Sequence, residues 1–200
     1  MIIILVGIPL GIWSAVKRDS VADSLISFLT LMGQSMPSFW LGVLLIMLFA
    51  VELRWLPTSG SGGLRHLILP AITLAVQPVS KFTRVTRTEF LEHLGRDYVR
   101  TARAKGLRER AVFLSHVLKN TLIPLVTLIS LDLGALLGGA IIVETVFGWP
   151  GLGRLIIQAI SQRDFPVIQA ATLYIALAIV IINFLVDMLY MVLDPRIRVS

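Results

Sequence analysis

Five apolar runs divide this chain, and their lengths restrict its fold more than any other feature. They cover residues 1–16, 25–51, 67–83, 121–143 and 167–193. The hydrocarbon core of a bilayer is roughly 30 Å thick, so a helix needs about 20 apolar residues to cross it. Of the 200 residues, 56% are hydrophobic and only 15% are charged, which is unlike a soluble domain. We therefore predict an all-α, polytopic membrane bundle of about five transmembrane helices, forming a single domain over 1–200.

Two of the runs are irregular. The run 67–83 contains Pro70, Pro78 and the polar Gln77. The run 1–16 would reach only about 24 Å as a helix, short of the bilayer core. It also begins without a basic segment, which argues against a secretory signal peptide. We expect that a segment preceding Met1 has been lost.

The basic residues fall mainly on one side of this five-span arrangement. The loops 17–23, 84–120 and 194–200, counted with Lys81, carry fourteen of the eighteen Lys and Arg, and the loops 52–66 and 144–166 carry four. Cytoplasmic loops of membrane proteins are enriched in Lys and Arg. The loop 84–120 and the C-terminus are therefore predicted to be cytoplasmic, and the segment 144–166 extracytoplasmic. The net charge of +6 is explained in this way without nucleic-acid binding.

The run 121–143 contains Asp132 near its centre. An acidic residue there raises the free energy of membrane insertion by roughly 2.5–3.5 kcal/mol. Thirteen Leu, Ile and Val residues lower it by about 0.3–0.6 kcal/mol each, so insertion of the run remains favourable. Asp132 either lines a translocation pathway or forms an interhelical hydrogen bond. The motifs Gly7-x-x-x-Gly11 and Gly134-x-x-x-Gly138 predict close packing of helices or a dimer interface.

No pattern in the chain indicates catalysis or cofactor binding. There is no cysteine, which excludes disulfides and thiolate metal sites. His66, His93 and His116 lack the spacing of metal ligands, and the glycines at 60, 62 and 63 are not followed by the Lys of a phosphate-binding loop. We expect no catalytic, metal or cofactor residues and no enzymatic activity, so energy for uphill transport would come from another subunit.

The basic loop has the features of a docking element. Good helix formers extend from about 87 to 104, Gly106 breaks the run, and a second helical stretch begins at Arg108. A short helix, a glycine bend and a returning helix would form a compact projection suited to a groove on a partner. The alternative is a basic loop that lies on anionic lipid.

Several motifs resemble one protein family. In chain order they are Met36-Pro-Ser-Phe-Trp40 with Trp55-Leu-Pro-Thr-Ser-Gly60, Thr101-Ala-Arg-Ala-Lys-Gly-Leu107 with Leu118-Lys-Asn-Thr-Leu-Ile-Pro124, Glu144-Thr-Val-Phe-Gly-Trp-Pro-Gly-Leu-Gly-Arg154, and Asp187-Met-Leu-Tyr190 with Asp194-Pro-Arg-Ile-Arg198. They resemble permeases of ATP-binding-cassette importers, in particular the B-type subunit of dipeptide and oligopeptide importers. In the wider superfamily this loop begins Glu-Ala-Ala, where this chain has Arg100-Thr101-Ala102, and the Pro that ends its Ile-x-Leu-Pro motif is displaced to Pro124. The peptide-permease version tolerates both changes. That subfamily also has an extra N-terminal span and an extracytoplasmic segment ahead of residue 1.

The resemblance implies a membrane subunit that forms the pathway of an ATP-driven importer. Its partners would be a second homologous permease subunit, two cytoplasmic ATPases that bind ATP, an extracytoplasmic substrate-binding protein and membrane lipid, in the plasma (inner) membrane of a prokaryote. The loop 97–113 would receive the ATPases, and the segment from Glu144 would contact the binding protein. The residues expected to couple to the ATPases are Arg100, Thr101, Ala102, Arg103, Ala104, Lys105, Gly106 and Leu107, and those expected at the binding protein are Glu144, Trp149, Pro150, Gly151, Gly153 and Arg154.

Other functions remain open on the sequence alone. The chain could be an ATP-independent channel or secondary transporter, with Asp132 as its intramembrane polar residue. It could also be a non-transporting membrane fragment whose basic loop binds lipid. Short peptides are the favoured class of substrate, and importers of nickel and of glutathione share the same architecture.

Overall fold

The computed structural model describes residues 2–193, apart from the side chains at 123, 126, 127, 129–131, 133–135, 137, 186, 187 and 189–193. The described chain is helical and contains no strand, which confirms the all-α prediction. Part of the predicted motif Asp187-Met-Leu-Tyr190 and all of Asp194-Pro-Arg-Ile-Arg198 lie outside what is described. The elements in chain order are η1 (Ile3–Gly7), α1 (Ile8–Val16), α2 (Val21–Ser35), α3 (Ser38–Leu45), η2 (Ile46–Glu52), α4 (Leu64–Leu94), α5 (Asp97–Ala104), α6 (Glu109–Ala111), η3 (Val112–Val117), α7 (Leu118–Val146), α8 (Leu152–Gln162) and α9 (Phe165–Leu193), where η marks a π-helical stretch.

Length and hydropathy identify fewer spans than the five predicted. Within the described residues, Phe165–Leu185 of α9 is long and apolar enough to cross a membrane. A second crossing is obtained when the broken pair Val21–Ser35 and Ser38–Glu52 is counted as one span, and Ile3–Val16 is a shorter apolar helix. The five-span topology and the single domain therefore remain predictions.

The predicted span 25–51 is not one helix. The chain breaks between α2 and α3 at Pro37, whose backbone is extended with φ −61° and ψ 136°. Proline has no N–H to donate and disfavours helical geometry in the residue before it, so the helix ends there. Gln77 donates its Nε2 to the Met36 carbonyl at 2.7 Å, which satisfies an acceptor beside the break. The polar residue that made the run 67–83 irregular thus has a structural partner.

Helix α4 is longer than the predicted span 67–83. It continues through Pro70 and Pro78 and ends only at Leu94. The hydroxyl groups of Thr73 and Thr83 donate to the carbonyls four residues earlier, at 2.8 Å in each case. The first part of the predicted loop 84–120 is therefore helical, because nothing between 84 and 94 interrupts the backbone hydrogen bonds.

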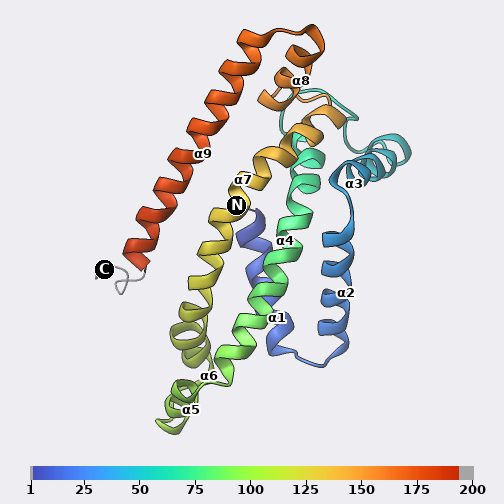
Figure 1. Cartoon of the computed structure of the whole chain (residues 1–200). Coiled ribbons are helices and arrows are strands. Elements are labelled where there is room, and N and C mark those ends of the chain that lie inside the picture. The colour runs from blue at the N-terminus through green and yellow to red at the C-terminus, as the bar shows by residue number, and fades with distance from the viewer. Residues whose placement is uncertain (1, 194–200) are drawn as a thin grey trace. The chain divides into compact units, whose positions relative to one another are not determined.

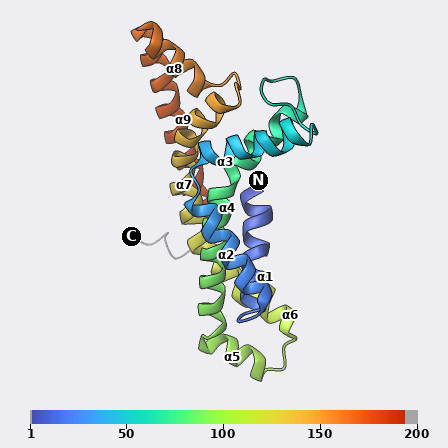
Figure 2. The same cartoon turned by 90° about the vertical axis from the view of Figure 1, so that its right-hand side faces the viewer.

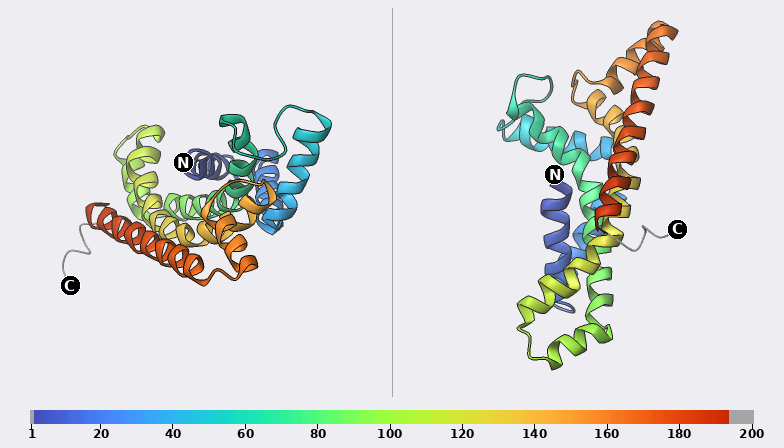
Figure 3. Two further views of the ribbon diagram at one scale, coloured as in Figure 1. Left: turned by 90° about the horizontal axis from the view of Figure 1, so that it is seen from above. Right: turned by 90° about the vertical axis from the view of Figure 1, so that its left-hand side faces the viewer.

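The chain divides into two compact units, which we describe separately. Unit 1 consists of Met1–Ser35, Pro78–Ile129 and Leu189–Ser200, and unit 2 of Met36–Gln77 and Ser130–Met188. In unit 1, α1 and α2 form a hairpin that lies along the C-terminal half of α4 (Figure 1). In unit 2, α8 is followed directly by α9 at a tight turn (Figure 3).

Unit 1 is held together by a close helix crossing and a buried core. A Cβ added at Gly11 would lie 2.6 Å from both the Thr83 carbonyl oxygen and Thr86 Cβ, so only glycine allows α1 to approach α4 this closely. Beside the crossing lies an apolar cluster, the loop core, that joins the end of α1 to the basic loop. Its buried members are Ala15, Phe90, Val99, Ala102, Val112 and Val117.

Unit 2 has its own apolar core, formed by Ala50, Leu69, Val143 and Phe147. Gly138 has no described atom within 4 Å of where a Cβ would lie. This part of the Gly134-x-x-x-Gly138 motif therefore makes no close helix contact within the described chain, in contrast to Gly11.

Candidate functional site

The basic loop contains the predicted short helix, glycine bend and returning helix. Helix α5 is Asp97–Ala104, Gly106 follows with φ +76°, and α6 begins at Glu109 after an extended Arg108 (Figure 2). The run of good helix formers from about 87 to 104 does not form one continuous helix. It is interrupted at Gly95 and Arg96, where Arg96 is extended with φ −75° and ψ 151°.

The bend at Gly106 closes α5 in a Schellman motif. The Gly106 N–H donates to the Arg103 carbonyl at 2.9 Å, and the Leu107 N–H donates to the Ala102 carbonyl at 3.3 Å. This pair of hydrogen bonds satisfies carbonyls at the helix end and places the residue after the C-cap in the left-handed region, where a side chain is disfavoured. No described atom lies within 4 Å of where a Gly106 Cβ would be. The backbone conformation, rather than lack of space, explains the glycine.

An ion pair crosses the bend. The Arg103 guanidinium donates from Nε and Nη2 to the two carboxylate oxygens of Glu109, at 2.8 and 3.2 Å. Both side chains are about half exposed, so this bidentate pair adds modest stability and chiefly fixes the direction in which α6 leaves the bend.

The structure separates one predicted coupling residue from the others. Ala102 is 5% exposed and belongs to the loop core. Its side chain lies inside the loop, because its helical position faces inward with Val99, and its part in coupling remains a prediction. The exposed members of the predicted set are Arg100, Thr101, Arg103, Ala104, Lys105, Gly106 and Leu107, the last an apolar side chain 42% exposed.

The segment after α7 is tied down by its own acidic and basic residues. The Glu144 carboxylate accepts the Arg154 backbone N–H at 3.0 Å, which caps the start of α8. The Glu144 backbone carbonyl accepts the Trp149 N–H at 2.8 Å, and Arg154 Nη1 donates to the Gly148 carbonyl at 2.6 Å. Three of the six residues predicted at the binding-protein face, Glu144, Trp149 and Arg154, are therefore held in one short, ordered turn by these hydrogen bonds.

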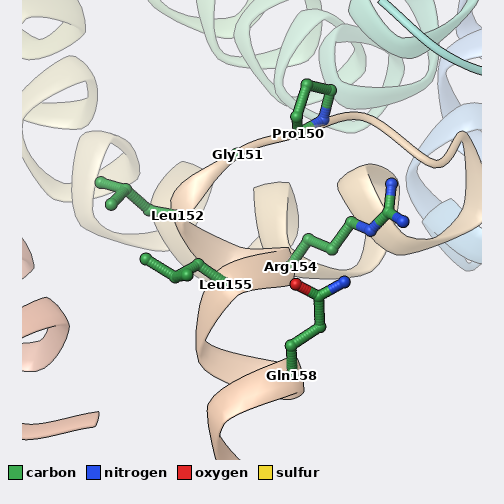
Figure 4. Close-up of a pocket in the computed structure, with 6 residues that line it drawn as sticks. All are labelled: Pro150, Gly151, Leu152, Arg154, Leu155 and Gln158. Carbon is green, nitrogen blue, oxygen red and sulfur yellow. The ribbon is translucent and has the colours of Figure 1, made fainter. Parts of the chain in front are cut away.

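The two glycines permit close approach within this turn. A Cβ at Gly151 would overlap the Glu144 carboxylate, and one at Gly153 would lie 2.5 Å from Ile141 Cα. A hollow of about 590 Å³ lies beside the turn, and Figure 4 shows Arg154 and Gln158 at one side of it, with Leu152 and Leu155 at the other. The surface of the turn thus offers both hydrogen-bond donors and apolar contacts.

Two further observations concern single acidic residues. Asp132 lies on α7 with a partly exposed side chain, and its part in a pathway remains a prediction. Asp23, which the sequence did not single out, is buried and paired with Arg87 at 2.7 Å. The partners are separated by 64 residues, so spacing gave no signal.

Within the described residues no group of three or more His, Cys, Asp or Glu could hold a metal.

Comparison with known proteins identifies the family. Residues 7–199 match the family described as "Binding-protein-dependent transport system inner membrane component". The chain belongs to this family. It is 49% identical, over 195 residues, to the glutathione transport system permease protein GsiC of Pectobacterium atrosepticum, covering 98% of the chain and 64% of that relative. It is 44% identical, over 224 residues, to the dipeptide transport system permease protein DppB of Escherichia coli K12, covering 96% and 66%.

The family membership confirms the predicted resemblance to peptide-type importer permeases. The chain spans a little under two thirds of the length of the glutathione permease relative. An inward-facing structure of the MetNI methionine ABC transporter matches the fold with a TM-score of 0.75 at 19% identity, covering 96% of this chain and 88% of that one. The permease fold therefore persists where little sequence identity remains.

Proposed function

We propose that this chain is a membrane subunit of an ATP-driven importer and forms part of its translocation pathway. The observation that carries the proposal is the closed bend at Gly106, which presents exposed basic residues and an apolar Leu107 on an ordered projection. Family membership supports the same role, since relatives are named as permeases of transport systems. ATP would be hydrolysed by partner subunits and not by this chain.

We propose that the exposed residues of the bend contact a cytoplasmic ATPase. Leu107 would enter an apolar part of a groove, while Arg100 and Lys105 would meet acidic residues around it. Ala102 would support the bend from inside. Closure of the ATPases on ATP would move the loop and bias the permease between two states.

The turn from Glu144 to Arg154 is proposed to face an extracytoplasmic binding protein. Its internal hydrogen bonds hold it in one shape, which lowers the entropy lost on docking. Cross-linking from Arg154 to a binding protein tests this assignment, and absence of a product in every nucleotide state would contradict it.

The substrate is proposed to be a short peptide, because relatives are named for glutathione and dipeptide transport. A second homologous subunit would complete the pathway, and Asp132 would lie along it. The chain would be a multi-pass protein of a prokaryotic inner membrane with a cytoplasmic C-terminus. Transport that is measured in vesicles, with and without an Asp132→Asn substitution, tests the pathway assignment.

Co-purification with an ATP-binding-cassette ATPase is the deciding experiment. Leu107→Asp places a charge on the exposed apolar contact and should abolish co-purification while the bend stays folded. Glu92→Gln is the matched control, because Glu92 is exposed, lies on α4 outside the bend and pairs with Arg96. Retention of the ATPase by Leu107→Asp would contradict the docking proposal.

The same experiment separates the alternatives. A channel or secondary transporter would move solute without any ATPase and would be unaffected by Leu107→Asp. A lipid-binding fragment would bind anionic vesicles through the basic loop but would not retain an ATPase.

A further inference from the structure

The coupling role proposed above names no part for the buried carboxylate of Asp23. Its side chain is 6% exposed, and both oxygens are fully engaged. Arg87 donates from Nε and Nη2 to Oδ1 and Oδ2 at 2.7 Å each. The Ser14 hydroxyl donates to Oδ1 at 2.5 Å, and the Asp19 backbone N–H donates to Oδ2 at 3.1 Å. Four donors thus converge on one carboxylate, which is far more than a surface ion pair requires.

The donors come from three different places in unit 1. Ser14 lies on α1, Asp19 lies in the turn before α2 with φ +62°, and Arg87 lies on α4. Removing one member of such a pair leaves an uncompensated charge in a poorly hydrated site, so the contact resists separation. Asp23 therefore holds the α1–α2 hairpin to α4 at one level of unit 1.

The same end of α1 touches the basic loop. Ala15, the neighbour of Ser14, is 3% exposed and is a member of the loop core, and Ile12 packs against that core. On α4, Phe90 of the loop core follows Arg87 by three residues, which is about one helical turn. The ion pair and the loop core are thus consecutive contacts along the same two helices.

We infer that the Asp23–Arg87 pair is a positioning element for coupling, which makes α1 and α2 move together with the basic loop when an ATPase displaces it. The inference rests on the proposed importer function. Apolar packing of Ala15 and Ile12 alone can slide, because it has no directional preference. A bidentate guanidinium–carboxylate pair fixes both distance and orientation. Loss of the pair would let the loop move while the hairpin stays behind.

The first test measures transport and ATP hydrolysis in the assembled importer complex, using Asp23→Asn, Arg87→Gln and the double variant. We expect substrate moved per ATP hydrolysed to fall roughly 2- to 30-fold, the range that substitutions in coupled networks produce. The double variant should be no worse than either single one, because both remove the same contact. Glu92→Gln is the control, since it breaks the exposed Arg96–Glu92 pair on the same helix.

The second test measures directly how the hairpin and the basic loop move relative to each other. A merely structural role of the ion pair would leave that relative movement unchanged. The 200 residues contain no cysteine, so Lys17→Cys and Arg110→Cys, both at exposed positions, accept spin labels in the hairpin and in the loop. With Asp23 intact, the distance between labels should stay constant through the nucleotide cycle. With Asp23→Asn it should change between the ATP-bound and nucleotide-free states.

The outcomes are distinguishable. If the complex forms and Gly106→Val uncouples it, yet the Asp23 and Arg87 variants match Glu92→Gln in transport per ATP and Asp23→Asn leaves the label distance constant, the inference is wrong and the importer proposal stands. If no ATPase complex forms with the unsubstituted chain, the importer proposal fails first. Should Asp23→Asn not fold, Arg87→Lys, which keeps the charge but not the two-pronged geometry, is measured against the same criteria.

Discussion

Substitution of Gly106 tests whether the bend, rather than a close contact, is what the basic loop requires. Gly106 has φ +76°, and no described atom lies within 4 Å of where its Cβ would be. A substituent therefore meets open space, and its cost comes from the backbone alone. Ala in the left-handed region costs about 1–2 kcal/mol. The β-branched Val costs more, up to about 3 kcal/mol for a strained residue. Asn tolerates this region and should cost least.

These energies predict an order of activities. Each 1.4 kcal/mol changes an equilibrium constant tenfold, so Gly106→Ala should lower the equilibrium constant for closing the bend by roughly 5- to 30-fold and Gly106→Val by more. The exposed Arg103–Glu109 pair opposes this loss by only about 0.2–1 kcal/mol. Coupled ATP hydrolysis should therefore decrease in the order glycine, Asn, Ala, Val.

The assay is substrate-stimulated ATP hydrolysis by the importer complex in proteoliposomes. Amide hydrogen exchange of residues 97–113 is measured alongside it, because exchange reports opening of the bend itself. If Gly106→Asn is as impaired as Gly106→Val, side-chain volume rather than backbone conformation decides, and the reasoning fails. Normal coupled ATP hydrolysis with Gly106→Val would also contradict the role assigned to the bend.

Three further predictions concern packing in the two units. Gly11→Ala should lower the free energy of unfolding in detergent by about 1–3 kcal/mol, because its Cβ meets the α4 backbone. Gly138→Ala, whose Cβ meets no described atom within 4 Å, should be neutral or stabilising. Equal effects of the two substitutions in thermal unfolding would contradict this prediction. Gly151→Ala should destabilise the start of α8, because its Cβ overlaps the Glu144 carboxylate. In a double-mutant cycle, the loss of unfolding free energy from Gly151→Ala combined with Glu144→Ala should be smaller than the sum of the two single losses. Additive losses would argue against the contact. Ala102→Leu should overpack the loop core and raise hydrogen exchange across residues 97–117, and unchanged protection would show that the position is not enclosed.

The candidate sites show where sequence reasoning succeeds. The bend at Gly106 was predictable because glycine after a helical run is a local signal that depends only on neighbouring residues. The segment from Glu144 to Arg154 was singled out by its resemblance to a family motif, and its hydrogen bonds join residues no more than ten apart. The break at Pro37 was also local, but the length of the apolar run 25–51 concealed it.

The sequence by itself determined the helical class, the excess of basic residues in one loop and the family to which the chain belongs. These depend on composition, periodicity and local motifs, which need no knowledge of distant contacts. Tertiary structure alone decided that Ala102 faces the loop core, that Gly11 rather than Gly138 packs closely, and that Asp23 binds Arg87. Each of those depends on which residues the fold brings together across long separations in the chain, and burial and pairing energies act through space with no trace in local spacing.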